Sequence, residues 1–164
     1  MKELKVKELD LESFLPFGYF ANLINPDTEK LGAPPVEFYR DILPLSLGEK
    51  TSASFSICRV EERPKIVDVS EYHSHGSEGI LPLDSDILIH VGPASRPGFV
   101  PLDKFCIFRV PKGTMVILKP GVWHHAPYVA KGKVANVLIA LPERTYANDC
   151  QVVKLKEKKK IKII

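Results

Sequence analysis

Short apolar segments, separated by turn-forming residues, recur along most of the chain. Several alternate apolar and polar positions and are rich in β-branched and aromatic residues, a pattern typical of β-strands. The segments that predict strands are residues 52–60, 66–69, 87–91, 105–110, 114–118 and 133–140. Because strands of this length follow one another at roughly 8–12-residue intervals, they indicate an antiparallel sandwich or barrel.

Helix is expected to be scarce. The 14 prolines and 10 glycines leave few stretches in which a helix could run without interruption. One helical turn is predicted over residues 11–14, with Asp10 as its N-cap and Pro16 ending it. Residues 25–35, with an Asn-Pro-Asp turn signal and two adjacent prolines, predict a surface loop.

The segment 154–164 is rich in lysine and alternates in character. Lysines occupy the even positions 154, 156, 158, 160 and 162, whereas apolar residues occupy positions 153, 155, 161 and 163. This alternation predicts either an edge strand or a terminal tail. Edge strands commonly carry a lysine-lined face that resists aggregation. The length of 164 residues predicts a single domain over 1–164.

Charge and composition narrow the classes of partner. The formal charge is +3, but residues 154–164 hold six lysines and one glutamate, so the rest has 17 basic and 19 acidic residues. A body with a net charge of −2 does not predict a nucleic-acid partner. No apolar run approaches the ~20 residues that span a bilayer, and the start of the chain lacks a signal-peptide core. Three widely separated cysteines are typical of free thiols in a reducing compartment, so we expect a cytoplasmic protein.

Histidines provide the candidate chemistry. They form two clusters, His73 with His75 and His124 with His125, and His90 stands alone in a predicted strand. On a strand Glu71, His73 and His75 would share one face, and imidazole and carboxylate are ligands of divalent first-row metals. The pattern predicts a metal pocket. Of the adjacent histidines, only one would face such a pocket on an extended backbone, and we expect it to be His124.

Two motifs resemble those of the cupin superfamily. Glu71-x-His73 is followed by four residues and Glu78, and Gly113 is followed by five residues and Lys119-Pro120-Gly121-Val122-Trp123-His124. Glu71 stands where the first histidine is usual, Ser85 replaces a glycine, and Lys119 replaces a proline. The resemblance implies a mostly β, double-stranded β-helix or jelly-roll barrel. It also implies a divalent transition metal (Ni, Zn, Mn or Fe) on His73, Glu78 and His124, with Glu71 as fourth ligand or as general base.

Within the cupins, residues 9 to 153 look like the ureidoglycolate lyase family. The segments that carry the resemblance are Phe14-Leu15-Pro16-Phe17-Gly18, Ser56-Ile57-Cys58-Arg59, Glu71-Tyr72-His73 with Glu78 and Pro82-Leu83, Val122-Trp123-His124-His125, and Asn148-Asp149-Cys150. The departures are Glu78 where glutamine is usual, His75 without a counterpart, and Ile139-Ala140-Leu141-Pro142 without the usual acidic residue. The resemblance implies cleavage of ureidoglycolate, or of a related small 2-hydroxy acid carbinolamide, to glyoxylate and urea.

That reaction suggests roles for further residues. Elimination needs a base for the hydroxyl proton, a donor for the departing nitrogen and a cation for the carboxylate. Glu71 is the candidate base, and His75 is the candidate proton donor or an additional metal ligand. Arg59 is expected either to bind the substrate carboxylate through its planar guanidinium or to form a surface ion pair. Trp123 is either a pocket wall or a core residue, and Lys119 is either a cation at the pocket rim or a solvated strand end.

Two other functions fit the same residues. A different metal-dependent cupin enzyme, of isomerase or oxygenase type, would use the same ligands on another substrate. A non-catalytic cupin would bind a small molecule without chemistry. In each case the expected partner is a small molecule, with no membrane or nucleic acid, and a homodimer is expected because open sheets have edges to cover.

Overall fold

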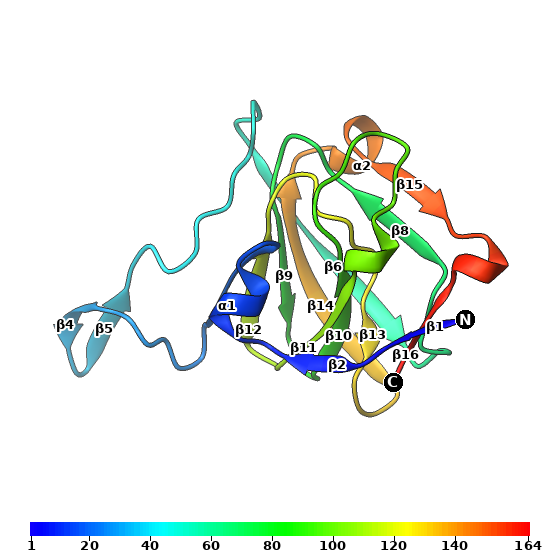
Figure 1. Cartoon of the computed structure of the whole chain (residues 1–164). Helices are drawn as coiled ribbons and strands as arrows, with labels where there is room; N and C mark the ends of the chain where they lie inside the picture. The colour runs from blue at the N-terminus through cyan, green and yellow to red at the C-terminus, as the bar shows by residue number, and fades with distance from the viewer.

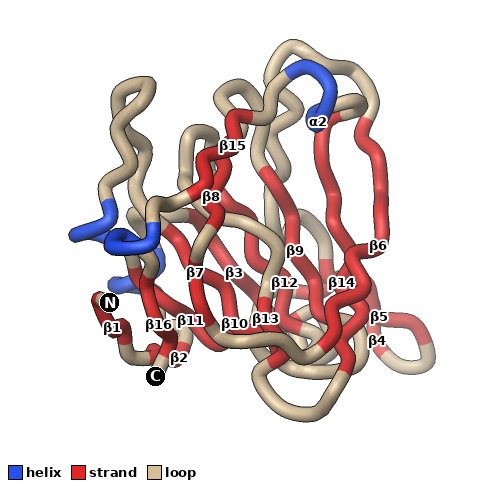
Figure 2. Tube along the Cα trace, turned by 90° about the vertical axis from the view of Figure 1, so that its right-hand side faces the viewer, coloured by secondary structure: helices blue, strands red, loops and turns tan.

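The structure is a computed structural model that describes residues 1–164, and it is built mainly of strands with helix only in short pieces (Figures 1 and 2). The strands are β1 Lys2–Leu4, β2 Val6–Glu8, β3 Gly18–Asn22, β4 Lys30–Ala33, β5 Val36–Tyr39, β6 Ala53–Glu61, β7 Ile66–Val67, β8 Val69–Tyr72, β9 Glu78–Pro82, β10 Ile87–Val91, β11 Cys106–Val110, β12 Thr114–Leu118, β13 Tyr128–Val129, β14 Val134–Pro142, β15 Gln151–Lys154 and β16 Ile161–Ile163. The helices are α1 Leu11–Phe14 and α2 Thr145–Asn148, with 3-10 turns at Leu102–Lys104 and Glu157–Lys159.

Two sheets enclose the main core. One has the strand order β3-β12-β9-β14-β6 and the other the order β13-β10-β11-β2. Side chains that alternate along β10, β12 and β14 point between the sheets and are fully or almost fully buried, as at Ile89, Val116 and Val137. Phe14 of α1 closes one end of this core against Phe108, with ring centroids 5.2 Å apart. The sandwich therefore follows from period-2 burial of apolar residues on facing strands.

A second apolar layer covers the outer face of the four-stranded sheet. Leu88 and Ile107 point away from the main core and pack with Trp123, Ile161 and other buried residues. Both faces of β10 are therefore buried, which explains its uninterrupted apolar sequence apart from His90. Ile161 lies in β16, so the end of the chain is part of this layer.

Most of the sequence expectations for elements are confirmed. The strands expected at 87–91 and 114–118 have the predicted bounds, and those at 52–60, 105–110 and 133–140 shift by one or two residues. The segment 66–69 is divided between β7 and β8. The helical turn over Leu11–Phe14 begins at Asp10, whose Oδ1 accepts a hydrogen bond from the Ser13 N–H at 2.9 Å. No helix in the structure has the length and apolar character that crossing a bilayer needs.

Two expectations were wrong. Residues 25–35 are only partly a loop, because Lys30–Ala33 pairs with Val36–Tyr39 in a hairpin. The lysine-rich segment 154–164 is not one edge strand or a tail. Residues 151–154 form β15, which pairs only with β8, whereas β16 lies between β1 and β7 as a middle strand. The 3-10 turn at Glu157–Lys159 breaks the alternation that the lysines suggested.

The burial of Ile161 leads to a stability prediction. Ile161 is 1% exposed, so Ile161→Ala should lower the free energy of unfolding by ~2–4 kcal/mol through lost transfer energy and a cavity. Lys162→Ala, next to it on the exposed face, should change that free energy by no more than ~0.5 kcal/mol. Urea unfolding of both variants measures the difference. Equal stabilities would show that β16 does not belong to the core.

The isolated histidine of the sequence, His90, is a buried core residue. Its Nε2 lies 3.0 Å from the Ser70 Oγ, and its Nδ1 has no hydrogen-bond partner. The Ser70 hydroxyl donates to the His124 carbonyl, so the His90 Nε2 carries the proton and donates to Ser70. Burial, reinforced by the nearby His124 imidazole, holds the pKa of His90 well below its usual value. His90 is therefore neutral in the folded protein.

A depressed histidine pKa makes stability depend on pH with a definite sign. The unfolded chain takes up a proton at His90 near pH 6.5, whereas the folded chain does so only at lower pH. The free energy of unfolding therefore decreases as the pH falls below ~6.5. Urea unfolding measures this change. Between pH 7.5 and pH 5.5, the free energy of unfolding of the native chain should decrease by ~1.4 kcal/mol more than that of His90→Leu. Parallel pH profiles for the two proteins would contradict a neutral buried His90.

Candidate active site

Three of the predicted ligands converge at one end of the sandwich. His73, Glu78 and His124 are buried, and their ligand atoms lie within 4.8 Å of one another. The Glu78 Oε2 lies 3.1 Å from the His73 Nε2 and 2.9 Å from the His124 Nε2. A carboxylate oxygen shared by two imidazoles is thus the centre of the site.

Backbone pairing brings these distant residues together. His73 follows the end of β8, Glu78 begins β9, and a pair of backbone hydrogen bonds between Glu71 and His124 fixes the second motif beside the first, at 2.6 and 2.8 Å. The turn that delivers His124 needs Gly121, which has a φ of 80°, a conformation that favours glycine. The Gly121 N–H donates to the His73 carbonyl at 2.6 Å, which holds this turn against β8.

The outer nitrogens of both imidazoles are fixed by backbone carbonyls. The His73 Nδ1–H donates to the Asp149 carbonyl at 2.7 Å, and the His124 Nδ1–H donates to the Val122 carbonyl at 2.8 Å. In the neutral imidazoles both Nε2 lone pairs would then face the Glu78 carboxylate. Protons on the imidazoles or a cation must therefore balance this cluster. Two imidazole nitrogens and a carboxylate, with outer hydrogen bonds in place, form a donor set that fits a divalent transition metal.

The charges within the cluster support each other. Burial raises the pKa of the Glu78 carboxyl, but the His124 and His73 imidazoles more than offset this and lower that pKa to about 2. Burial lowers the pKa of His124, but the Glu78 carboxylate overcomes this and raises that pKa above its usual value. Glu78 is therefore an anion at neutral pH and is available as an anionic ligand.

Glu71 approaches the cluster from another side. It is 9% exposed and forms a second group of ligand atoms within 4.8 Å, together with His73 and Cys150. The Cys150 thiol donates to the Glu71 Oε2 at 3.4 Å. Burial and the Glu71 carboxylate raise the pKa of Cys150 to about 12, so the thiol stays protonated and positions the carboxylate.

A cavity of about 210 Å³ opens beside these carboxylates. Its lining residues are Cys58, Glu71, Glu78, Ile80, His125, Ala126, Pro127, Ile139 and Tyr146. His125 therefore contributes to the cavity wall, contrary to the expectation that it would face away from the pocket. Burial lowers the pKa of His125 and raises that of Tyr146, so both side chains are neutral at pH 7.

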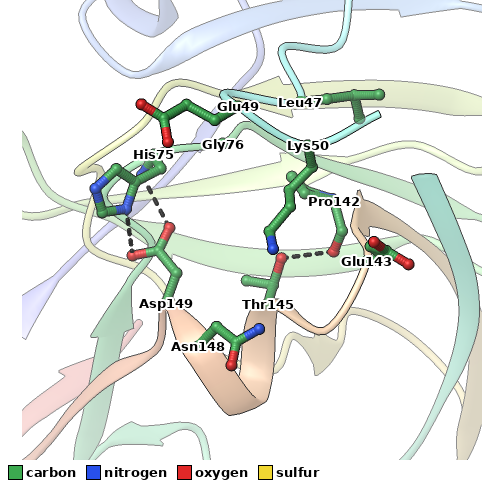
Figure 3. Close-up of a pocket in the computed structure, with 10 residues that line it drawn as sticks. All are labelled: Leu47, Glu49, Lys50, His75, Gly76, Pro142, Glu143, Thr145, Asn148 and Asp149. Atoms are coloured by element: carbon green, nitrogen blue, oxygen red, sulfur yellow. Dashed lines mark hydrogen bonds and ion pairs between the residues drawn. The ribbon is translucent and has the colours of Figure 1, made fainter. Parts of the chain in front are cut away.

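His75 lies outside this cavity, although the sequence pattern placed it with Glu71 and His73. Strand β8 ends at Tyr72 and the chain bends, so the alternation of side chains is lost before His75. The His75 side chain is 75% exposed and its Nδ1 lies 3.2 Å from an Asp149 carboxylate oxygen. It lines a separate cavity of about 170 Å³ with Lys50, Thr145 and their neighbours (Figure 3).

The three predicted substrate-binding residues also lie away from the cluster. Arg59 is on the outer face of β6 and pairs with Glu61, because its neighbours Cys58 and Val60 take the inward positions. Trp123 is 1% exposed in the second core layer, where its Nε1 donates to the Ser95 hydroxyl at 2.9 Å. Lys119 donates to the Leu15 carbonyl at the end of α1, at 2.6 Å.

Sequence reasoning missed a cation that contacts a residue of the cavity wall. Arg63 follows β6, donates to the carbonyl of the cavity residue Ala126 at 2.9 Å, and lies over the Tyr128 ring with its guanidinium carbon 4.2 Å from the ring centroid.

The sequence analysis also assigned no structural role to Asp149, although Asp149 lies in a segment that carried the family resemblance. Its carboxylate accepts hydrogen bonds from the backbone of Ser74 and His75, both at 2.8 Å.

The fold and the site together define a cupin-type fold of two facing sheets with a buried His/Glu cluster. The chain belongs to the ureidoglycolate lyase family, whose model matches residues 1–162.

Proteins named ureidoglycolate lyase from Rhodobacter capsulatus and Burkholderia cepacia are each 29% identical to it over 141 residues. These matches cover 84% of this chain and 86% of the first relative, and 83% of this chain and 77% of the second. The fold is similar to that of a dTDP sugar isomerase from Desulfovibrio desulfuricans, with a TM-score of 0.55 and 13% identity over 88% of this chain and 89% of that one.

The arrangement predicts which histidine matters for metal binding. His73→Ala removes a ligand from the cluster and should weaken binding of Zn²⁺ or Mn²⁺ by more than the roughly 10–100-fold that loss of an outer-shell partner costs. His75→Ala, two positions away but directed into another cavity, should leave the affinity unchanged. Isothermal titration of the metal-stripped proteins compares the two. Equal losses in both variants would contradict this ligand assignment.

Proposed function

We propose that this chain is a ureidoglycolate lyase that converts ureidoglycolate to glyoxylate and urea. The observation that carries the proposal is a buried carboxylate, Glu71, beside the His73, Glu78 and His124 cluster in a cavity of about 210 Å³. Membership of the family and two relatives that bear this enzyme's name support it. The substrate is a small molecule, and the proposal requires no nucleic acid.

His73, Glu78 and His124 would hold a divalent transition metal, and Glu71 lies beside this cluster. Such an ion supplies Lewis-acid chemistry, lowering the pKa of a hydroxyl that it binds and holding a carboxylate. Three further tasks require side chains of the protein: transfer of one proton, binding of the substrate carboxylate and orientation of the urea group.

Glu71 is proposed as the general base. In the elimination, the substrate hydroxyl gives up its proton, its oxygen forms the carbonyl of glyoxylate, and the carbon–nitrogen bond breaks. The urea nitrogen gains one proton, so a single carboxylate can accept the proton from the oxygen and return it to the nitrogen. Glu71 lines the cavity and its Oε2 is held by the Cys150 thiol, which leaves the other oxygen available for this transfer.

Arg63 is proposed as the residue that attracts the substrate carboxylate. The cavity wall carries two acidic side chains, Glu71 and Glu78, so an anionic substrate needs a compensating cation. Arg63 is already held at the rim through the Ala126 carbonyl and the Tyr128 ring, and its remaining N–H groups can bind a carboxylate. Arg59, on the outer face of β6, cannot reach the cavity from its observed position.

His125 and Tyr146 are proposed to orient the urea group. Both line the cavity, and both are neutral at pH 7, so each can donate a hydrogen bond to the urea carbonyl oxygen without giving up its proton. The Tyr146 ring also contacts His73 edge-on, with ring centroids 5.9 Å apart, so Tyr146 touches the cluster as well as lining the cavity.

The direct test is release of glyoxylate and urea from ureidoglycolate by the purified, metal-loaded protein. Equal amounts of the two products are expected, since the elimination forms one of each. A chelator should lower the rate if the cluster holds a metal. A protein that binds the metal but releases no glyoxylate would overturn the proposal and favour another metal-dependent cupin enzyme or a binding protein.

The two arginines provide a matched pair for the substrate contact. Arg63→Gln removes the cation at the rim and should lower kcat/KM by roughly 10- to 100-fold, mainly through KM, because a charge-assisted hydrogen bond is lost. Arg59→Gln removes the same charge from the outer face and should leave kcat/KM within about twofold of the native value. Steady-state kinetics distinguish them. A larger effect at Arg59 would restore the original prediction for that residue.

A further inference from the structure

A further cavity lies beside the end of β15. It has a volume of about 220 Å³ and is lined by residues from 98–102 and from 153–159, where β15 leads into the 3-10 turn at Glu157–Lys159. Figure 1 shows this turn in red, directly after β15. No residue lines both this cavity and the cavity beside Glu71. The two cavities are therefore separate sites.

The charged side chains that line this cavity are all lysines. Lys154, Lys156 and Lys159 line it, and no acidic residue does. All three are exposed and none makes an ion pair within the chain, whereas the neighbouring Lys160 pairs with Glu157. Cations that share a small cavity repel one another, so an anion bound there would lower the electrostatic energy. We call this cavity the lysine pocket.

Two further cations flank the lysine pocket. The Lys2 Nζ donates to the carbonyl of the lining residue Leu102 at 2.8 Å. The guanidinium carbon of Arg96 lies 5.6 Å from the ring centroid of Phe99, which is another lining residue. Asp103 follows Leu102 in the chain, and the cations around the pocket outnumber it. The potential of this surface is therefore positive, which favours an anionic ligand.

The floor of the lysine pocket is apolar and belongs to the core. Val100, Leu102 and Val153 pack against the second core layer, and Leu155 is 7% exposed within that layer. Phe99 is 49% exposed and adds an aromatic ring to the pocket wall. An inorganic anion would gain nothing from this apolar surface. A planar organic ring would bury apolar area against it and stack on Phe99, so the pocket favours an anion that carries a ring.

The size of the lysine pocket fits part of such a ligand. Pockets that enclose a whole drug-sized molecule have volumes of ~300–1,000 Å³, so about 220 Å³ is enough for a ring system but not for the rest of the ligand. The charged groups of the ligand would then lie outside the apolar floor, where the exposed lysine side chains can reach them. An ammonium group on a flexible stem, with three donors, suits a phosphate chain.

We propose that the lysine pocket binds a nucleoside phosphate, with the base against Phe99 and the apolar floor and the phosphates on Lys154, Lys156 and Lys159. This class of molecule combines a planar ring with several negative charges, and each part matches one part of the pocket. The proposal does not depend on the reaction at the His/Glu cluster, because the two sites share no lining residue.

Isothermal titration of the full chain with ATP, inorganic triphosphate and adenosine tests both parts of the ligand. ATP should bind with a dissociation constant below about 1 mM. Triphosphate lacks the ring and should bind about fivefold more weakly or worse, and adenosine lacks the charges and should give no measurable binding. Phe99→Ala should weaken ATP binding by about fivefold or more and leave triphosphate unchanged. Phe55→Ala, a change of another exposed aromatic residue on β6, should affect neither ligand.

Two pairs of lysines control for net charge. The double variant Lys154→Gln/Lys156→Gln removes two charges from the lysine pocket and should raise the dissociation constant for ATP by roughly 10-fold or more. The double variant Lys131→Gln/Lys133→Gln removes two charges from the exposed loop before β14 and should leave that constant within about twofold of the native value. Circular dichroism checks that each variant keeps the native fold.

Four results would each overturn the proposal. The first is no binding of ATP at about 1 mM, and the second is an equal loss of affinity in the two lysine pairs. The third is triphosphate binding as tight as that of ATP, which would assign the pocket to a simple anion. The fourth is ATP binding that His73→Ala abolishes and the pocket lysines do not affect, which would place ATP at the His/Glu cluster.

Discussion

The site depends on a carboxylate buried between two imidazoles. Glu78 could not stay ionised at 6% exposure without the His73 and His124 rings, which offset its loss of hydration and lower its pKa to about 2. The rings in turn are oriented by backbone carbonyls on their outer nitrogens. The protein therefore has to balance the charge of this cluster with protons or with a cation, and that requirement gives the pocket its chemistry.

The fold meets this requirement by joining distant segments. The Glu71–His124 backbone pair fixes the second motif beside the first. The segment around Asp149 contacts the chain after His73 through the Ser74 N–H. The Asp149 carbonyl orients His73, its carboxylate holds the bend after His73, and the next residue, Cys150, positions Glu71. A short element near the end of the chain thus supports both the ligand and the proposed base.

Much of this was predictable from the sequence, and the exceptions have physical reasons. Alternation identified the strands with one buried face, and motif spacing brought together His73, Glu78 and His124. Alternation failed where the backbone bends, which took His75 out of the pocket, and it also placed His125 outside a cavity that this residue lines. Arg59 was predicted to bind substrate because it lies in a segment shared with the family, but its neighbours Cys58 and Val60 occupy the inward positions of β6. No local sequence pattern predicts a role for Arg63, because only the tertiary fold brings it to Ala126.

In the proposed reaction, the carboxylate of Glu71 moves the proton from the substrate oxygen to the urea nitrogen. The most direct measurement is kcat for Glu71→Gln with ureidoglycolate, together with the metal content of the same sample. We predict a loss of about 10²- to 10⁴-fold in kcat, with the metal and the fold retained, because glutamine fills the space but cannot accept the proton. A variant that keeps its metal and turns over at the native rate would contradict the assignment.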